Sequence, residues 1–428
     1  MTRKRLHFGG LWRHPDFMKL WIGETISSFG ARISSVAIPL AAALTLQATA
    51  AQMGYLNAAQ FMPFLMVTLF AGVWVDRRHR RPTMIATNLA RAVLLAVIPV
   101  LAWLGWLSIG ILCAVVFLIG LFQVLFELAY QAYLPSLVTR EQLVEGNSKL
   151  QASSSAAQVG GPGLAGLLTG WFTAPVALLG NTCTYLVSAL ALTLIRKPEP
   201  PLAVAEVGRS LWRDIGDGFR VMWGNPYLRA VCGEAATYNL FGMAVITVYT
   251  LYATRDLGLS AGMYGLIFSI AGGGALLGAL IAGWAAKRIG FGRAFFWGMV
   301  AACAAPLLIP IASGRSFLNV VILTVSFFIN GMAETVTNVH GVVLRQSTTP
   351  GPLLGRMNAS YRFVTSGTTP LGALLGGALG GLIGLRMTLL VSGIGLMLGL
   401  LWVAFSPVPR LAQVPAEPWG TDRAPRTL

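Results

Sequence analysis

Charged residues are scarce in this sequence, and acidic residues are the scarcest of them. Only 11% of the 428 residues are charged, and Asp and Glu together number 15. A soluble domain carries roughly 25% charged residues. In addition, 55% of the chain is hydrophobic, in long apolar runs that start within the first fifty residues and continue into the last thirty. These proportions exclude an ordinary soluble protein and indicate a chain whose solvent is the lipid bilayer.

The residues that most enzymes and metal sites need are also few. The chain has four histidines and four cysteines, and no two cysteines form a Cys-x-x-Cys pair, so buried free thiols are expected. It contains no His-Glu-x-x-His, nucleophile elbow, phosphate loop or carboxylate cluster with metal-ligand spacing. We therefore expect no enzyme, no metal site and no cofactor. Residues 1–17 lack the pattern of a cleavable signal, so the first apolar segment is expected to stay in the membrane.

Basic residues are in clear excess. The 31 Lys and Arg residues give a net charge of +16, which in a soluble protein would indicate a nucleic-acid partner. Here the basic residues lie in short breaks between apolar runs, and no surface that alternates aromatic and basic residues is visible. The pattern therefore predicts the lipid bilayer as a partner and excludes nucleic acid.

The apolar runs predict transmembrane helices. Each run can span about 30 Å of hydrocarbon at about 1.5 Å per residue. An even number of spans places both termini on one side of the membrane. The predicted helices are 17–43, 52–75, 83–104, 108–133, 147–172, 174–195, 227–253, 261–286, 293–313, 317–343, 356–383 and 386–406.

The distribution of positive charge selects the orientation. Loops on the side of the termini are rich in Lys and Arg, as in the run Arg77 to Arg81, whereas the opposite loops contain only Arg255, Arg315 and Arg386. Positive loops stay in the cytoplasm. We therefore expect a multi-pass protein of the plasma (inner) membrane with both termini cytoplasmic, and the preference for Arg over Lys indicates a bacterial source.

The chain divides into two similar sets of six helices. The longest interior break separates a first bundle, 1–195, from a second, 227–406, and a tail, 407–428, is expected to be disordered. Within the linker 196–226, residues 210–223 have apolar residues at helical spacing, which predicts a short helix at the membrane interface. At an offset of about 210 residues Gly72 matches Gly283 and Glu127 falls near Glu334. The sequence thus predicts an all-α membrane protein of twelve helices in two pseudo-symmetric bundles, with a pathway between them.

One loop carries a family resemblance. The stretch 72–82, Gly-Val-Trp-Val-Asp-Arg-Arg-His-Arg-Arg-Pro, resembles the loop motif Gly-x-Leu-x-Asp-Arg-x-Gly-Arg-[Arg/Lys] of the major facilitator superfamily. Trp74 and His79 depart from that motif. Residues 134–147 and 345–356 are similar to the branch of macrolide-efflux and enterobactin-exporter proteins. The resemblance covers about residues 10–405 and implies alternating access by rocking of the two bundles. The matching positions are Gly72, Asp76, Arg77, Arg80 and Arg81.

A gate at the cytoplasmic side is one expectation for this motif. The Asp76 carboxylate can dock against the positive N-terminal end of the helix predicted at 356–383. Arg77 and Arg80 can pair with an acid at the cytoplasmic end of the helix at 108–133, and the family suggests Glu127 for that partner. The alternative is that the arginines are simply the positive charge of a cytoplasmic loop, which is the expectation for Arg81.

Ionisable side chains within the spans are functional candidates because each is costly in lipid. The glutamates Glu24, Glu127, Glu234 and Glu334 fall on the first, fourth, seventh and tenth helices, which line the central cavity in the resembling superfamily. They either bind protons and a cationic substrate, or form the gate with the arginines. In apolar surroundings the charged form of a carboxylate is disfavoured, so such a group can hold a proton and release it to a cation or water.

Other polar residues within the spans complete the candidate site. Arg32 either binds an anionic group of the substrate, pairs with a glutamate, or extends its charge toward the membrane interface. Tyr238 and Asn239 are expected to reach the cavity. Pro162 and Pro370 can bend their helices where bending would help a rocking motion.

The sequence therefore predicts a secondary active transporter. We expect it to export small amphipathic molecules, a drug or a secondary metabolite, by alternating access and proton antiport, as a monomer. Part of residues 161–166, Gly-Pro-x-x-Ala-Gly, resembles an antiporter motif of the superfamily. The alternatives are a dedicated siderophore, metabolite or lysophospholipid transporter, and a membrane sensor with a transporter-like body.

Overall fold

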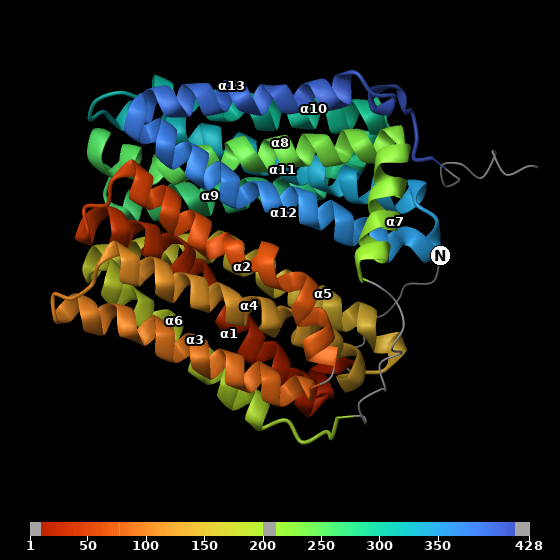
Figure 1. Ribbon diagram of the computed structural model, residues 1–428, viewed down its shortest axis with the longest axis horizontal. Helices are drawn as coiled ribbons and strands as arrows, with labels where there is room; N and C mark the ends of the chain where they lie inside the picture. The colour runs from red at the N-terminus through yellow and green to blue at the C-terminus, as the bar shows by residue number, and fades with distance from the viewer. Residues whose placement is uncertain (1–9, 77, 200–210, 416–428) are drawn as a thin grey trace, which may run out of the picture.

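The computed structural model describes residues 10–76, 78–199 and 211–415, without the side chains of residues 68–76 and 211–215. Long antiparallel helices make up these ranges, and no strand occurs in them. Figure 1 shows the helices running along the long axis of the molecule, with α7 lying across their ends. The helices are α1 (Pro15–Leu40), α2 (Ala50–Asp76), α3 (Arg80–Trp103), α4 (Ile109–Leu137), α5 (Leu143–Trp171), α6 (Ala174–Thr193), α7 (Leu211–Gly224), α8 (Pro226–Leu251), α9 (Ala261–Ile289), α10 (Phe291–Ala304), α11 (Phe317–Thr348), α12 (Gly351–Leu382) and α13 (Leu385–Ala404).

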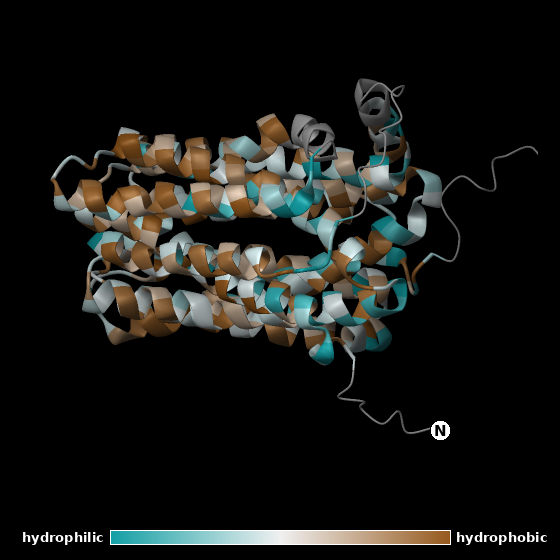
Figure 2. Ribbon diagram, turned by 90° about the horizontal axis from the view of Figure 1, so that it is seen from below, coloured by the Kyte–Doolittle hydropathy of each residue, from teal (hydrophilic) through white to brown (hydrophobic). Residues whose placement is uncertain are grey.

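A long helix stands at each of the predicted ranges, and the all-helical prediction is confirmed. Among the described residues, nine helices are long and apolar enough to cross a membrane. The helices outside that set are the short linker helix α7 and the long helices α2, α5 and α12. Helices α5 and α12 carry many Gly, Ser and Thr residues. Figure 2 shows hydrophobic ribbon over most of the helical length and hydrophilic ribbon gathered toward the right-hand end of the view.

Two halves with the same packing pattern form the molecule. Helices α1–α6 form the N-half, drawn from red to yellow-green in Figure 1, and α8–α13 form the C-half, drawn from green to blue. In the N-half, α1 packs on α5 and α6, α4 packs on α2 and α3, and α3 packs on α6. In the C-half, α8 packs on α12 and α13, α11 packs on α9 and α10, and α10 packs on α13. Every N-half contact in this set has its counterpart, so the predicted pseudo-symmetry is confirmed.

A local irregularity repeats in the same way. Helix α1 continues into a π-helical turn at Ala41–Thr45, and α8 continues into a π-helical turn at Tyr252–Asp256. These turns start about 210 residues apart, which is the offset that the sequence predicts. Single π turns often mark functional sites. Both lie at the end of the molecule opposite α7, which we call the far end, as distinct from the α7 end.

The halves meet chiefly through two helix pairs, α2 against α12 and α5 against α9, with a smaller contact of α2 on α8. Near the far end the helices touch at glycines. A Cβ added at Gly54 in α2 would lie 3.0 Å from the Cα of Gly377 in α12, and one added at Gly166 in α5 would lie 3.0 Å from the Cα of Gly265 in α9. Only glycine lets two backbones approach this closely. The far end is therefore closed by backbone contact between the halves.

Polar contacts add to this closure. The Asn57 side chain in α2 donates a hydrogen bond to the Thr247 hydroxyl in α8, at 3.2 Å. On the far-end surface the Arg255 guanidinium donates to the carbonyl oxygen of Ala43 at 3.2 Å and lies 3.4 Å from the side-chain oxygen of Gln47. Arg255 thus joins the two π-helical turns.

The linker helix α7 belongs structurally to the C-half. It packs on α12 and α8, and the Asp217 carboxylate accepts a hydrogen bond from Arg356 in α12 at 3.1 Å. The predicted helix at 210–223 therefore exists. The domain boundaries themselves stay a prediction.

Several predicted helix ends are wrong by four or five residues. Helix α4 continues to Leu137 rather than 133, and α5 begins at Leu143 rather than 147. In the C-half, α11 continues to Thr348 rather than 343, and α12 begins at Gly351 rather than 356. The first residue that cannot continue a helix is Pro350, so the chain remains helical up to that proline and starts a new helix directly after it. As a result Arg345, expected in a loop, lies inside α11.

Candidate functional site

A cavity of about 790 Å³ lies between the two halves. Its walls come from α1, α2 and α5 of the N-half and from α8, α9, α11, α12, α13 and the 3-10 turn Ala305–Ile311 of the C-half. A cavity of this size accommodates a drug-sized molecule. Of the predicted substrate residues, it brings together Arg32, Tyr238, Asn239 and Glu334. We call it the central cavity.

The C-half wall presents an acid beside a hydrogen-bond network. Glu334 is exposed, lines the central cavity and lies within electrostatic range of Tyr238. The Asn330 amide donates to the Tyr238 hydroxyl and to the carbonyl oxygen of Ala302, each at 2.8 Å. Asn239 donates to the carbonyl oxygen of Thr365 at 2.8 Å. These bonds fix the orientation of the polar groups around Glu334.

The N-half wall presents a cation and amides. Arg32 in α1 lines the central cavity together with Gln60 in α2 and Gln151 and Gln158 in α5. The α5 residues that line the cavity lie at helical spacing and end with Pro162, so one face of α5 forms much of this wall. The two walls of the cavity therefore carry charges of opposite sign.

A second, smaller pocket of about 280 Å³ lies inside the N-half. It contains Glu24 and Glu127, and Arg32 lines both this pocket and the central cavity. Glu127 accepts a hydrogen bond from the Gln123 side chain at 2.8 Å. Glu24 lies within electrostatic range of Arg91 and Glu127, and its Oε2 is buried without a hydrogen-bond partner among the described residues. We call this space the N-half pocket.

Arg91 is the cation of the N-half pocket. Its side chain donates hydrogen bonds to Gln123 and Asn88, and its guanidinium lies 4.4 Å from the ring centre of Phe126 and 4.5 Å from that of Tyr185. Only 2% of Arg91 is exposed. Arg91 therefore lies where its charge can compensate that of Glu24 and Glu127.

The four predicted glutamates do not form one ring. Glu334 faces the central cavity, whereas Glu24 and Glu127 lie in the N-half pocket. Glu234 in α8 is only 6% exposed and lies within electrostatic range of Glu334 and Arg345. The sequence indicates the depth of these residues but not the direction in which each one faces around its helix.

The predicted gate is only partly described. Arg77 lies outside the described residues, and so does the side chain of Asp76, although Gly72 and Asp76 both fall in α2. For Arg80 the described contact is through the backbone: its N–H donates to the Glu199 carboxylate at 2.9 Å, and the Arg81 N–H donates to the same group. Glu199 thus caps the N-terminus of α3, where a negative charge is stabilised. The gating role of the motif stays a prediction.

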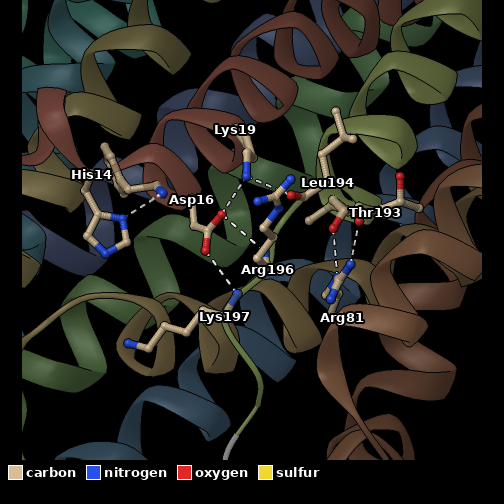
Figure 3. Close-up of polar contacts among 10 residues, drawn as sticks. His14, Asp16, Lys19, Arg81, Thr193, Leu194, Arg196 and Lys197 are labelled. Atoms are coloured by element: carbon tan, nitrogen blue, oxygen red, sulfur yellow. Dashed lines mark hydrogen bonds and ion pairs between the residues drawn. The ribbon is translucent and has the colours of Figure 1, made fainter.

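Basic side chains hold the C-terminal end of α6. The Arg81 guanidinium donates to the carbonyl oxygens of Leu192 at 2.8 Å and Thr193 at 2.6 Å. The Lys19 ammonium donates to the carbonyl oxygen of Leu194 at 2.7 Å (Figure 3). Cations at this end satisfy the free carbonyl groups and complement the helix dipole. The described contacts of Arg81 are therefore structural.

The first linker residues are fastened to the N-half at the same place. The Asp16 carboxylate accepts the Lys19 ammonium at 2.7 Å and the backbone N–H groups of Arg196 at 3.2 Å and Lys197 at 3.0 Å (Figure 3). The Lys197 ammonium donates to the carbonyl oxygen of Leu137 at the end of α4, at 2.9 Å. Residues 196–199 thus belong structurally to the N-half, a role that the sequence analysis missed. In the sequence, Asp16 and Glu199 are single acidic residues among basic ones, and this pattern could have predicted that they hold the linker to the N-half.

Both predicted helix-bending prolines lie inside helices, Pro162 in α5 and Pro370 in α12. Pro162 also lines the central cavity. Both helices make the contacts between the halves, so the prolines stand at positions where bending would alter those contacts.

Comparison with known proteins decides the family. Residues 10–425 match the family described as transmembrane secretion effector, of the major facilitator superfamily. The chain belongs to this family. It is 26% identical over 372 residues to the multidrug efflux pump Tap of Mycolicibacterium fortuitum, covering 82% of this chain and 86% of Tap. It is 24% identical over 420 residues to the enterobactin exporter EntS of Citrobacter koseri, covering 95% of this chain and 96% of EntS.

The fold matches solved transporters. A bacterial homologue of the iron transporter ferroportin, solved in an inward-facing state, superimposes with a TM-score of 0.70 at 16% identity and covers 91% of this chain and 98% of its own. The family and the fold together make this transmembrane secretion effector a multi-pass transporter of the efflux and secretion type, which acts on small molecules in the bilayer.

Proposed function

We propose that this secretion effector exports small amphipathic molecules by alternating access, in exchange for protons. The observation that carries the proposal is the central cavity, which combines apolar walls with one cation and one acid contributed by opposite halves. Rocking of the halves changes the surroundings of both charges at once. Substrate binding can therefore be linked to the conformational change.

Glu334 is the residue that we assign to the exchange step. It faces the cavity from α11, where a proton and a basic or hydrogen-bond-donating group of the substrate can compete for the carboxylate. Glu24, Glu127 and Glu234 lie outside the central cavity but close to the charged groups that border it. We assign Glu24 to proton binding as well, because its Oε2 has no described partner.

Export as the direction of transport is supported by the efflux and exporter relatives, and the orientation in the membrane is the one that the positive loops predict. The α7 end, with Arg80, Arg81, Lys19 and Lys197, then faces the cytoplasm, and the closed far end faces outward. The cavity in this conformation is the one that loads substrate from the inner side of a bacterial cell membrane. We propose a monomer as the transporting unit, since each chain provides both halves of the cavity.

A dedicated transporter for one siderophore, metabolite or lysophospholipid is the second candidate. The observation that favours it is Arg32, because a charge within a span is more useful for one defined substrate than for many unrelated drugs.

Accumulation of ethidium and a macrolide in a bacterium without its own efflux pumps tests the proposal. We expect cells that express the protein to accumulate severalfold less of at least one compound. Glu334→Gln, which removes the titratable group but keeps its size, should restore accumulation, and so should an uncoupler. Arg288→Gln, at the exposed end of α9, is the control and should leave efflux unchanged.

Two outcomes would count against the proposal in different ways. If accumulation of both compounds is unchanged while the protein is present in the membrane, broad drug export is wrong and the dedicated transporter is favoured. If efflux occurs but neither the uncoupler nor Glu334→Gln affects it, proton exchange is wrong.

A further inference from the structure

Arg32 is a charged group in the central cavity without a charged partner. The residue is exposed, it lines the cavity, and among the contacts of the described residues its guanidinium makes no hydrogen bond or ion pair. Neither acid of the N-half pocket forms an ion pair with Arg32 among the described contacts: Glu127 accepts a hydrogen bond from Gln123, and Glu24 lies within electrostatic range of Arg91. A cation held within a span without compensation is costly, so a site for an anion is expected at this position.

The neighbouring amides point to the same kind of ligand. Gln60, Gln151 and Gln158 line the cavity on the N-half side, and none of their side chains makes a hydrogen bond to another described residue. The C-half wall differs, because Asn239 and Asn330 already donate to the protein. The N-half wall therefore offers free N–H donors on the same wall as a guanidinium, and a carboxylate, sulfonate or phosphate monoester accepts from both kinds of donor.

We propose that the N-half wall of the central cavity binds an anionic group of an amphipathic substrate, with Arg32 making the charged contact. This proposal rests on the proposed transport function of the same cavity and narrows its substrate class. The planar guanidinium can donate two parallel hydrogen bonds to such a group. The apolar body of the substrate then lies among Phe61, Met243 and Phe268, which line the remainder of the cavity.

Gly161 in α5 is the positioning residue for this contact. A Cβ added to Gly161 would overlap the Cβ of Arg32 and lie 3.2 Å from its Cγ. The missing side chain lets α1 pack on α5 with the stem of Arg32 in the space between the helices. A larger residue at 161 would displace the guanidinium without changing any charge.

Binding of two matched dyes to the full-length protein tests the proposal. The dyes are a rhodamine with a free carboxylate and its methyl ester, which differ only in the anionic group. The protein is placed in nanodiscs of neutral phosphatidylcholine, and dye binding is followed by fluorescence anisotropy, with empty nanodiscs subtracted.

We expect the carboxylate dye to bind about tenfold more tightly than its ester, as a charge-assisted contact of ordinary strength implies. Arg32→Gln should remove that preference, and Arg32→Lys should keep part of it. Gly161→Ala should weaken binding of the carboxylate dye selectively. The controls are Arg288→Gln, an equal change of charge at the end of α9, and Gly170→Ala, on α5 where a Cβ would meet no atom within 4 Å.

The proposal is overturned if the ester binds as tightly as the carboxylate, if neither dye binds the wild-type protein, or if Arg32→Gln keeps the preference. A further arm replaces part of the lipid by phosphatidylglycerol. Competition by this lipid would support the anion site and identify a lipid headgroup as an occupant, while no competition would support a soluble anion. The binding assay does not depend on transport. If the protein exports ethidium but binds the two dyes equally tightly, the anion site is wrong while the proposed transport function stands.

Discussion

Replacing Gly377 with Val is expected to abolish most of the transport while leaving each half folded. Gly377 lies against Gly54 at the far end, and its added Cβ would lie 2.8 Å from the Gly54 Cα and 2.9 Å from the carbonyl oxygen of Ala50. Overpacking at such a contact costs about 1–3 kcal/mol, which shifts the balance between closed and open far ends by about fivefold to a hundredfold. Efflux measured in cells should fall accordingly.

The matched control lies one turn along the same helix. A Cβ added at Gly381 would meet no atom within 4 Å, so Gly381→Val should leave efflux near the wild-type level. Both variants should reach the membrane in equal amounts. Equal activity of the two variants would show that the backbone contact at Gly54 and Gly377 is not part of the transport cycle.

The second large effect is expected for Arg91→Leu, and it concerns stability. Arg91 is almost fully buried between Phe126 and Tyr185 and lies within electrostatic range of Glu24 and Glu127. Removing one member of a buried charged arrangement costs about 3–5 kcal/mol, because the remaining charges lose their compensation. The thermal unfolding temperature of the purified protein should therefore fall by about 5 °C or more.

A second substitution separates charge from packing. Adding Glu24→Gln to Arg91→Leu removes one of the carboxylates that lost its cation, so part of the stability should return. The single variant Arg288→Gln, at the exposed end of α9, should unfold at the wild-type temperature. If Arg91→Leu also unfolds at the wild-type temperature, the cation of the N-half pocket does not stabilise the protein, and our account of this pocket is wrong.

The fold could be predicted from the sequence because each of its causes is local. Apolar runs of sufficient length define the helices, and the repeat of Gly72 at Gly283 and of Glu127 near Glu334 reveals the duplication. Helix ends are harder to predict where the sequence has no proline that would end the helix. Arg345 was placed in a loop because charge ended the apolar run, although the chain remains helical until Pro350.

The candidate site was predictable only in part. Position on the predicted helices made Arg32, Tyr238, Asn239 and Glu334 candidates, and all four line the central cavity. The sequence did not show that Glu24 faces the N-half pocket instead of the central cavity. The direction of its side chain depends on how α1 is rotated against α5 and α6. That rotation is fixed by close approaches such as Gly161 against Arg32, and a single sequence does not show which glycines make such contacts.

The most direct test of the central claim, that the two halves rock around the cavity, is a pair of distances measured by spin labels. One pair of labels spans the far end, at Tyr55 in α2 and Leu382 in α12, and the other spans the α7 end, at Val144 in α5 and Ile289 in α9, all exposed positions. We predict that acidification, or Glu334→Gln at neutral pH, changes the two distances in opposite directions. Distances that stay constant, or that lengthen or shorten together, would contradict alternating access.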